Sequence, residues 1–452
     1  MSRSIRKYSC SAPTVATTRN AGIAGSRIFS SRSACSDSAS IDRSSVVSWT
    51  GEALDKKTPV LRPVATWLYT EGRRLRDAGT LIEGVGAQLD AAGAHVDRLA
   101  LMSRTLHPQL VGWSVFWSRI NGVRRDSIGH GVRSSDAYVG SPIQRVQENL
   151  EAVRLHIGPQ PQEGEHALVQ DLCDEGITDY YALPMISSAG TVNAMTLATS
   201  HADGFSAADF ERFKALSNLL APLVEIIAVR RSTRGLLDTF VGPRISERII
   251  QGQVKRGDGD RIDAAFWYSD LRGFTQLSES LPTAELLSLL NDYFEYCAVA
   301  AASRGGEILQ FIGDAILIVF EIGAAGDRAS VCEAALEAAR DAFNSIAVVN
   351  HRRRRAGHAV IEFGLGLHVG TVTHANVGSR DRLAFNVVGP AVNMTARIQS
   401  MTKEIGVPLL LSAEFASQVT ARLQSVGRHD LRGVASAQEL FTPTEELVSL
   451  YS

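Results

Sequence analysis

Paired cysteines and long hydrophobic runs are what this sequence lacks. Its five cysteines are scattered, with none of the paired spacing typical of a zinc site or a disulfide framework (Cys10, Cys35, Cys173, Cys297, Cys332). The most apolar stretch, residues 216–229, is interrupted by polar residues and a proline, and it is short of the ~20 residues that span a bilayer. We therefore predict a chain with no transmembrane segment in a reducing, cytoplasmic location.

An excess of charge of one sign is also absent. The formal net charge of -2 gives no global reason to expect nucleic acid or an anionic membrane as a partner. A basic run at 351–355 lies between a predicted helix (328–350) and a predicted strand (361–369), so we interpret it as a solvated loop rather than a nucleic-acid site. With 452 residues, 45% apolar and 21% charged, the chain suits two or three soluble domains.

The first 36 residues are rich in serine and arginine and contain no acidic residue. This composition matches an organellar transit peptide. A disordered tail has the same composition, and no sustained amphipathic helix is visible, so we predict a disordered head over residues 1–45.

Residues 64–229 have a mixed α/β pattern. The pattern predicts helices at 65–78, closed by Gly79, and at 81–99, and strands at 112–117 and 191–197. Ser206 followed by Asp209 has capping-box spacing and predicts the start of another helix. A small sheet between long terminal helices resembles a GAF-like sensor domain, which implies an unknown small-molecule or protein regulator. His107, in the run Arg104-Thr-Leu-His-Pro108, is either a ligand-binding residue or a turn residue.

A helical connector is predicted over residues 230–261, because apolar residues recur there every three or four positions. Such a segment can pair with its twin in a dimer and transmit a rotation or register shift. A plain spacer explains the same pattern.

The run 264–269 has strand character and ends at Asp270, which Leu271-Arg-Gly-Phe-Thr275 follows. An acid at the end of a buried strand can hold Mg²⁺, and backbone N–H groups at the next helix start can hold phosphate oxygens. A helix then begins near Thr283, its predicted N-cap. Strands at 307–312 and 315–320 follow, joined at Gly313-Asp314, a hairpin-turn signal. The hairpin can lie beside the first strand, so the Asp314 carboxylate can reach the same ion as Asp270.

Asn393 and Arg397 lie four residues apart in a predicted helix that starts near Gly389-Pro390, so both occupy one face. A solvated face is the ordinary interpretation of such a pair. The neighbouring Gly364-Leu-Gly366 is no dinucleotide fingerprint.

Three runs together resemble class III adenylate/guanylate cyclases: Phe266-Trp-Tyr-Ser-Asp-Leu-Arg-Gly-Phe-Thr275, Gly305-Gly-Glu-Ile-Leu-Gln-Phe-Ile-Gly-Asp-Ala315 and Val387-Val-Gly-Pro-Ala-Val-Asn-Met-Thr-Ala-Arg397. The resemblance implies an α+β fold, with a ferredoxin-like cyclase catalytic domain over residues 262–445. It also implies a homodimer, because in this family the metal ligands of one chain face the Asn and Arg of another.

By this resemblance, Asp270, Leu271 and Asp314 bind two Mg²⁺ or Mn²⁺ ions, which activate the ribose 3′-hydroxyl and hold the pyrophosphate leaving group. Asn393 orients the ribose, and Arg397 neutralises charge on the α-phosphate. The resemblance also implies that the other phosphates are bound by the run Gly273, Phe274 and Thr275 and by Arg432.

The base-recognising positions depart from the family pattern. They hold Gln310 and Asn386, where adenylate cyclases usually have Lys and Asp or Thr, and guanylate cyclases Glu and Cys. Each amide has both a donor and an acceptor, so the pair suits adenine and can rotate to suit guanine. We predict an adenylate cyclase that makes cyclic AMP from ATP, with measurable turnover of GTP. The alternatives are a guanylate or dual-specificity cyclase and a nucleotide-binding module without catalysis.

Overall fold

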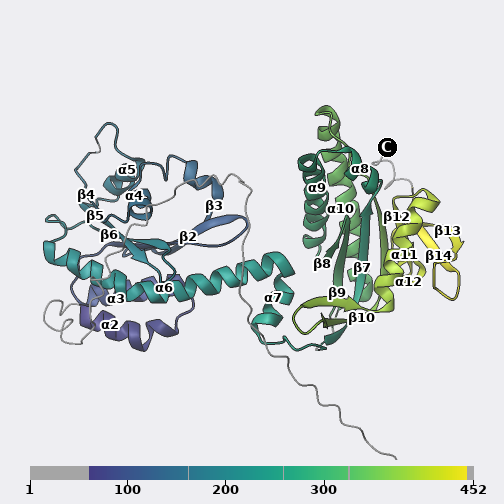
Figure 1. Ribbon diagram of the computed structural model, residues 1–452, viewed down its shortest axis with the longest axis horizontal. Helices are drawn as coiled ribbons and strands as arrows, with labels where there is room; N and C mark the ends of the chain where they lie inside the picture. The colour runs from purple at the N-terminus through teal and green to yellow at the C-terminus, as the bar shows by residue number, and fades with distance from the viewer. Residues whose placement is uncertain (1–60, 161, 258, 324–325, 445–452) are drawn as a thin grey trace, which may run out of the picture. The chain divides into compact units, whose positions relative to one another are not determined.

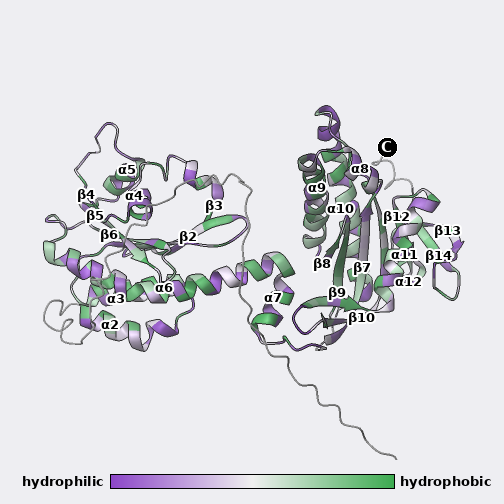
Figure 2. Ribbon diagram, viewed as in Figure 1, coloured by the Kyte–Doolittle hydropathy of each residue, from purple (hydrophilic) through white to green (hydrophobic). Residues whose placement is uncertain are grey.

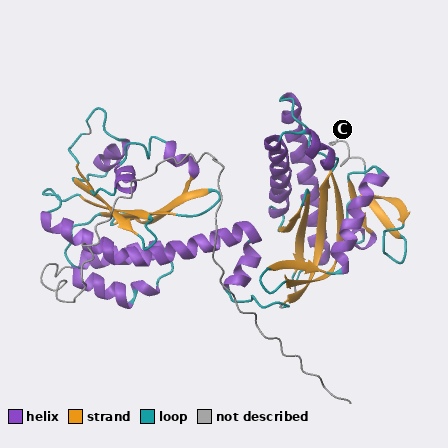
Figure 3. Cartoon of the chain, viewed as in Figure 1, coloured by secondary structure: helices purple, strands orange, loops and turns teal. Residues whose placement is uncertain are grey.

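The computed structural model describes residues 61–160, 162–257, 259–323 and 326–444 (Figure 1). The described part of the chain contains two β-sheets, each with its own helices and hydrophobic core (Figure 3). No helix in these ranges is long and apolar enough to cross a membrane. The predicted head, residues 1–45, lies outside the described residues.

The N-terminal sheet has six strands in the order β3-β2-β1-β6-β5-β4, and every neighbouring pair is antiparallel. Its strands are β1 (Arg98–Arg104), β2 (Leu110–Ser118), β3 (Gly122–Gly129), β4 (Val153–His156), β5 (Asp179–Ile186) and β6 (Val192–Thr199). The strands predicted at 112–117 and 191–197 are therefore confirmed as β2 and β6.

Helices lie on both faces of this sheet. Large side chains such as Leu99, Leu101 and Trp113 pack with α2 (Leu61–Thr70), α3 (Ala78–Ala91) and α6 (Ala207–Val241). The opposite face carries small residues such as Ala194 and Ala198, and these pack with α4 (Pro142–Asn149) and α5 (Ala167–Asp174). Period-2 alternation of large and small side chains thus gives the sheet two different cores.

Both predicted N-terminal helices have wrong boundaries. The first ends at Thr70, and a short 3-10 helix, Gly72–Arg74, follows it. Gly79 lies inside α3 rather than closing a helix, because the Asp77 side chain accepts a hydrogen bond from Thr80 N and caps α3 there. The second predicted helix ends at Ala91, and Leu99 belongs to β1.

Helix α6 begins with the predicted capping box: the Ser206 hydroxyl accepts from Asp209 N while the Asp209 carboxylate accepts from Ser206 N. The helix then runs without a break into the predicted connector, through its residues 230–241. It ends at Gly242, whose φ of 85° lies in the region that favours glycine. The connector continues as α7 (Pro243–Ile250), and Arg244 of α7 forms an ion pair with Glu321. Figure 2 shows hydrophobic and hydrophilic residues alternating along α6.

The C-terminal sheet runs β13-β14-β12-β10-β7-β9-β8, with β11 paired to β10. Its strands are β7 (Gly259–Leu271), β8 (Glu307–Ile312), β9 (Ala315–Ile322), β10 (Phe363–Gly378), β11 (Leu383–Val388), β12 (Leu409–Ser412), β13 (Leu423–His429) and β14 (Gln438–Pro443). The helices are α8 (Phe274–Ser280), α9 (Thr283–Ala302), α10 (Arg328–Arg355), α11 (Pro390–Ile405) and α12 (Ala413–Ala416).

The core of this domain has the chain order β7-α9-β8-β9-α10-β10 and the spatial order β10-β7-β9-β8. This β-α-β-β-α-β arrangement is ferredoxin-like, so the predicted fold is confirmed. Helices α9 and α10 bury one face of the sheet, including Trp267, Ile318 and Leu367. Helix α11 packs on the other face, over Phe266 and Val372.

Two local predictions in this domain are wrong. Thr283 is the first residue of α9 rather than its cap, and Pro282 at the cap position has no side-chain hydrogen bond. The basic run 351–355 is the last turn of α10, not a loop. Arg353 is 7% exposed there, forms an ion pair with Asp292 and donates to the carbonyl of Ala359. These contacts stabilise the helix in a segment whose charge predicted a solvated loop.

Candidate functional site

Two carboxylates meet at one edge of the C-terminal sheet. Asp270 stands near the end of β7, opposite Ala315 of β9. Asp314 directly precedes Ala315 in the tight β8–β9 turn, where Gly313 has a φ of 65°. The two side chains lie close enough for the charge of Asp314 to act on Asp270. The hairpin therefore brings Asp314 to Asp270, as the sequence pattern predicted.

This pair is electrostatically unfavourable without a cation. Oδ1 of Asp270 is buried and has no hydrogen-bond partner among the described residues. Burial, followed by the negative charge of Asp314, raises the pKa of Asp270 from 3.8 to about 7. Tyr268 lies on the same face of β7, and burial and the two carboxylates raise its pKa too. Sequence reasoning missed Tyr268, which only its period-2 spacing from Asp270 could have indicated.

The donor set suits a hard divalent cation. The described residues contain no cluster of three or more His, Cys, Asp or Glu side chains that could hold a metal alone. Two carboxylates with an uncommitted oxygen fit Mg²⁺, which is usually held by one or two carboxylates plus substrate phosphates and water. Leu271, the third predicted ligand, pairs with Phe363 in the sheet and has a buried side chain, so only its backbone can take part.

The segment after Asp270 turns sharply into a short helix. Gly273 has a φ of 69° and precedes α8, in which Phe274 and Thr275 are the first two residues. Arg272, which we did not single out from the sequence, donates from Nη2 to the carbonyls of Thr402 (3.3 Å) and Val407 (2.8 Å). It thereby ties the loop after Asp270 to the C-terminal end of α11.

Helix α11 carries Asn393 and Arg397. Asn393 is exposed and Arg397 is half-buried, whereas Thr395 between them is fully buried against the sheet. The helix approaches β10 closely: a Cβ on Gly366 would lie 2.7 Å from the backbone nitrogen of Gln399. The Gly364-Leu-Gly366 run therefore serves helix–strand packing.

No contact joins the carboxylate pair to the Asn/Arg pair in the described part of one chain. Asp270 pairs with Gly364 on β10, whereas Gly370 lies under Ala391 at the start of α11. Six residue steps, about 20 Å of strand, therefore separate Asp270 from the start of α11, whereas Thr395 and Gln399, which flank Arg397, lie over Gly366. In the described part of the chain, no hydrogen bond or ion pair joins Asp270 or Asp314 to the α11 pair.

A loop that carries a second basic residue lies beside Arg397. A Cβ on Gly433 would lie 3.4 Å from Nη2 of Arg397, so the loop between β13 and β14 borders this guanidinium. Arg432 in the same loop is exposed. The structure thus places the predicted phosphate-binding residue next to Arg397, although the two are 35 positions apart in the sequence.

The two predicted base-recognising residues lie on different strands. Gln310 is exposed on β8, beside an irregularity in the β8–β9 pairing. Asn386 is half-buried on β11, and its Oδ1 accepts a hydrogen bond from Val387 N at 2.8 Å. Since that backbone N–H needs an acceptor, the free group of Asn386 is its amide N–H₂. Only Gln310 keeps the freedom to turn its amide over.

A buried polar chain lies behind the carboxylates and was not anticipated. Nε1 of Trp267 donates to the Ser269 hydroxyl at 2.9 Å, and that hydroxyl lies 2.7 Å from the hydroxyl of Tyr293 on α9. All three residues are fully buried. Because their polar atoms are satisfied, the chain fixes the last part of β7 against α9 next to Asp270.

Comparison with known proteins identifies this region. Residues 260–441 match the family model described as the adenylate and guanylate cyclase catalytic domain. The chain is 24% identical over 286 residues to adenylate cyclase 1 of Rhizobium meliloti (strain 1021), which covers 61% of this chain and 42% of that protein. It is 34% identical over 145 residues to an adenylate cyclase of Anabaena cylindrica, covering 32% of this chain and 28% of that one.

Among solved structures, the adenylyl cyclase CyaB from P. aeruginosa covers 42% of this chain and 96% of its own, with 24% identity and a TM-score of 0.38. The chain spans less than half the length of these two curated relatives.

Proposed function

Residues 260–441 belong to the class III adenylate/guanylate cyclases, and from this premise we propose that the protein converts ATP into 3′,5′-cyclic AMP and pyrophosphate. The Asp270–Asp314 pair carries the proposal. A partly buried carboxylate whose pKa is about 7, with one uncommitted oxygen, is costly in a structural role and useful for holding cations. When bound, two Mg²⁺ or Mn²⁺ ions would activate the ribose 3′-hydroxyl and neutralise the triphosphate.

The remaining residues position the nucleotide. Asn393 orients the ribose, and Arg397 offsets the charge that grows on the α-phosphate in the transition state. Arg432, beside Arg397, binds the terminal phosphates together with the backbone at Gly273 and Thr275. These roles follow the family pattern, and the adjacency of Arg397 to the 432–433 loop supports them.

Two copies of the chain are needed to complete the site. In the described part of one chain no hydrogen bond or ion pair joins the carboxylates to the α11 pair, which fits a site that takes one set from each of two chains. A second observation supports this homodimer. Ile226, Val229 and Phe240 are 47%, 58% and 74% exposed and lie on α6 at heptad spacing, which suits helix pairing between copies.

A complementation experiment tests the shared site. Asp314→Ala and Arg397→Ala are each expected to abolish activity, because each defect affects both sites of its own homodimer. Random mixing makes about half of the dimers heterodimers, each with one intact site, so coexpression should restore about a quarter of wild-type activity. No restoration in dimers shown by mass spectrometry to be mixed would contradict the shared site.

ATP is the proposed main substrate. Asn386 offers a donor to adenine N1 while Gln310 accepts from N6. A rotated Gln310 can donate to guanine O6, but the Asn386 N–H₂ then faces the guanine N1–H, so guanine fits less well. Product analysis of the purified protein with Mn²⁺ and either nucleotide decides between them, and equal or greater turnover of GTP would favour a guanylate or dual-specificity cyclase. A wild type that is as inactive as the Asp314→Ala variant would instead favour a nucleotide-binding module.

Regulation by a small molecule at a GAF-like N-terminal domain is the final part of the proposal. A cavity of about 380 Å³ lies on the small-residue face of the N-terminal sheet, bordered by Ser114, Tyr180 and Thr196. Cavities of this size accept small ligands. The continuous α6 helix gives the domain a direct connection to α7, and a change in cyclase rate when residues 61–241 are deleted is the expected result.

A further inference from the structure

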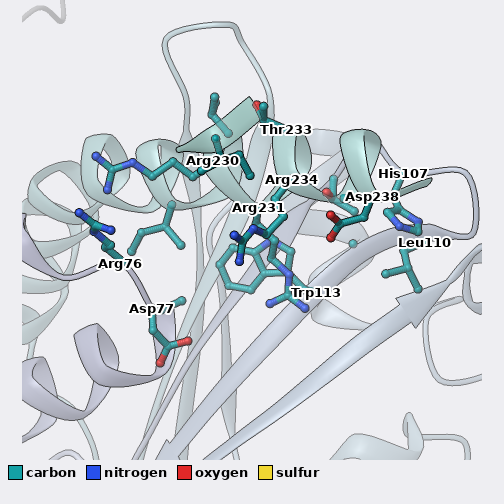
Figure 4. Close-up of a pocket in the computed structure, with 17 residues that line it drawn as sticks. Arg76, Asp77, His107, Leu110, Trp113, Arg230, Arg231, Thr233, Arg234 and Asp238 are labelled. Atoms are coloured by element: carbon teal, nitrogen blue, oxygen red, sulfur yellow. The ribbon is translucent and has the colours of Figure 1, made fainter. Parts of the chain in front are cut away.

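A second groove, of about 810 Å³, lies where α6 passes the end of the N-terminal sheet (Figure 4). One side consists of the last turns of α6. The other consists of the segment before α3, the β1–β2 loop and the start of β2. The guanidinium groups of Arg230, Arg231, Arg234 and Arg76 surround it.

One of these arginines, Arg231, occupies an unusual place on α6. Phe213, Leu220, Val224 and Ile227 form the buried face of α6, at steps of three, four or seven residues. The next step in that series is Arg231. A helix that simply packed on the sheet would continue with apolar residues here, so the change to arginine occurs on the face that points at the domain.

Most of the positive charge in the groove has no carboxylate partner. Among the described residues, Arg76 and Arg230 form no ion pair, and Arg231 contacts only the Ser127 hydroxyl (3.4 Å) and the Trp113 ring (5.4 Å). Arg234 pairs with Glu247.

Two aspartates also line the groove. Asp77 is already paired with Arg125, and the hydrogen bond from that arginine lowers the pKa of Asp77 to about 2. Asp238 is therefore the one uncommitted carboxylate among the lining residues that the structure describes. Three uncommitted guanidinium groups exceed it in charge.

Two neutral rings that line the groove, those of Trp113 and His107, each have an N–H donor. Trp113 is 0% exposed, and its buried Nε1 has no acceptor among the described residues. Nδ1 of His107 accepts from Gln109 N at 3.1 Å, so in the neutral ring the other nitrogen carries the proton. A buried donor without an acceptor is costly.

We propose that this groove binds a small oxyanion, a phosphate or carboxylate group, which bridges α6 and the end of the N-terminal sheet. Guanidinium groups grip both oxyanions through paired N–H donors. The bound anion would tie α6 to the β1–β2 loop, where Thr105 Oγ1 already lies 2.8 Å from Ser232 Oγ and His107 packs on Gly235. Binding is independent of the proposed cyclase activity and is measured without it.

The test uses the full chain in EDTA and about 0.15 M salt, where screening suppresses non-specific attraction. Inorganic phosphate and citrate are titrated in separate experiments, each followed by calorimetry and by tryptophan fluorescence. Comparing the two titrations distinguishes a phosphate ligand from a carboxylate ligand. We expect binding of at least one anion, weakened about tenfold or more in Arg230→Gln/Arg231→Gln because charge-assisted hydrogen bonds are lost. Arg73→Gln, an exposed arginine outside the groove, is the matched control and should bind like wild type.

Two outcomes would overturn the proposal: no binding of either anion to the wild type, or equal binding by the wild type and the double variant. The second outcome would assign the affinity to another site, such as Arg397 and Arg432. Both substituted arginines are exposed, so the variant should fold, and an unchanged melting temperature without anion verifies this.

Discussion

Replacing Asp270 by asparagine should stabilise the metal-free protein at high pH while abolishing catalysis. Burial and the Asp314 charge raise the pKa of Asp270 to about 7, well above the 3.8 expected without them. The folded state therefore favours the protonated form. The contribution of this carboxyl to the stability of the folded state is fully present below pH 4. It is lost as the pH rises through 7, because Asp270 ionises more readily in the unfolded chain than in the folded one.

The size of the effect follows from that pKa difference. Each pKa unit corresponds to about 1.4 kcal/mol, so a gap of about three units gives about 4 kcal/mol, and solvent access to a half-buried group reduces this to about 2 kcal/mol. A neutral asparagine avoids the penalty. At pH 8 in EDTA we expect Asp270→Asn to raise the melting temperature of the C-terminal domain by roughly 4–8 °C, with little or no gain at pH 4.

Scanning calorimetry of the wild type, Asp270→Asn and Asp314→Asn across this pH range is the assay. Asp314→Asn should stabilise less, because burial is the larger cause of the Asp270 shift and persists in that variant. Asp381→Asn, in an exposed loop, is the control and should show no pH-dependent gain. An Asp270→Asn variant that melts at or below the wild-type temperature at pH 8 would refute the reasoning.

Three further changes probe the scaffold. Gly366→Ala places a Cβ 2.7 Å from Gln399 N, so α11 must shift; we expect a loss of about 1–3 kcal/mol in urea unfolding and a matching fall in cyclase rate. Asp179→Ala removes a fully buried carboxylate that accepts from Arg154 (2.6 Å) and Phe205 N (2.8 Å), and it should cost the N-terminal domain about 3–5 kcal/mol while the C-terminal melting transition is unchanged. Burial lowers the pKa of His374 from 6.5 to about 4. The free energy of unfolding should therefore fall by up to about 3 kcal/mol as the pH drops from 6.5 to 4. In urea titrations, His374→Gln should reduce this dependence of the unfolding free energy on pH.

Local signals in the sequence predicted the elements that carry the site. The apolar run before Asp270, the Gly313-Asp314 turn and the Ser206–Asp209 capping box each depend on neighbouring residues, and the structure contains all three as predicted. Predictions were wrong where contacts between distant residues outweighed the local sequence pattern. The basic run 351–355 was interpreted from its charge, but the contacts of Arg353 with Asp292 and Ala359 extend α10 through it.

By itself the sequence determined which chemical groups are present and in what order: two acids, an Asn/Arg helix face and two amides in place of the usual base-recognising residues. Only the tertiary structure decided their relations. It showed that the two acids lie close together and that Asp270 is buried enough to raise its pKa. It also showed that Asn386 is anchored by Val387 N, and that α11 begins about 20 Å along β10 from the acids. Distance, burial and desolvation arise between residues far apart in the chain, so no local pattern encodes them.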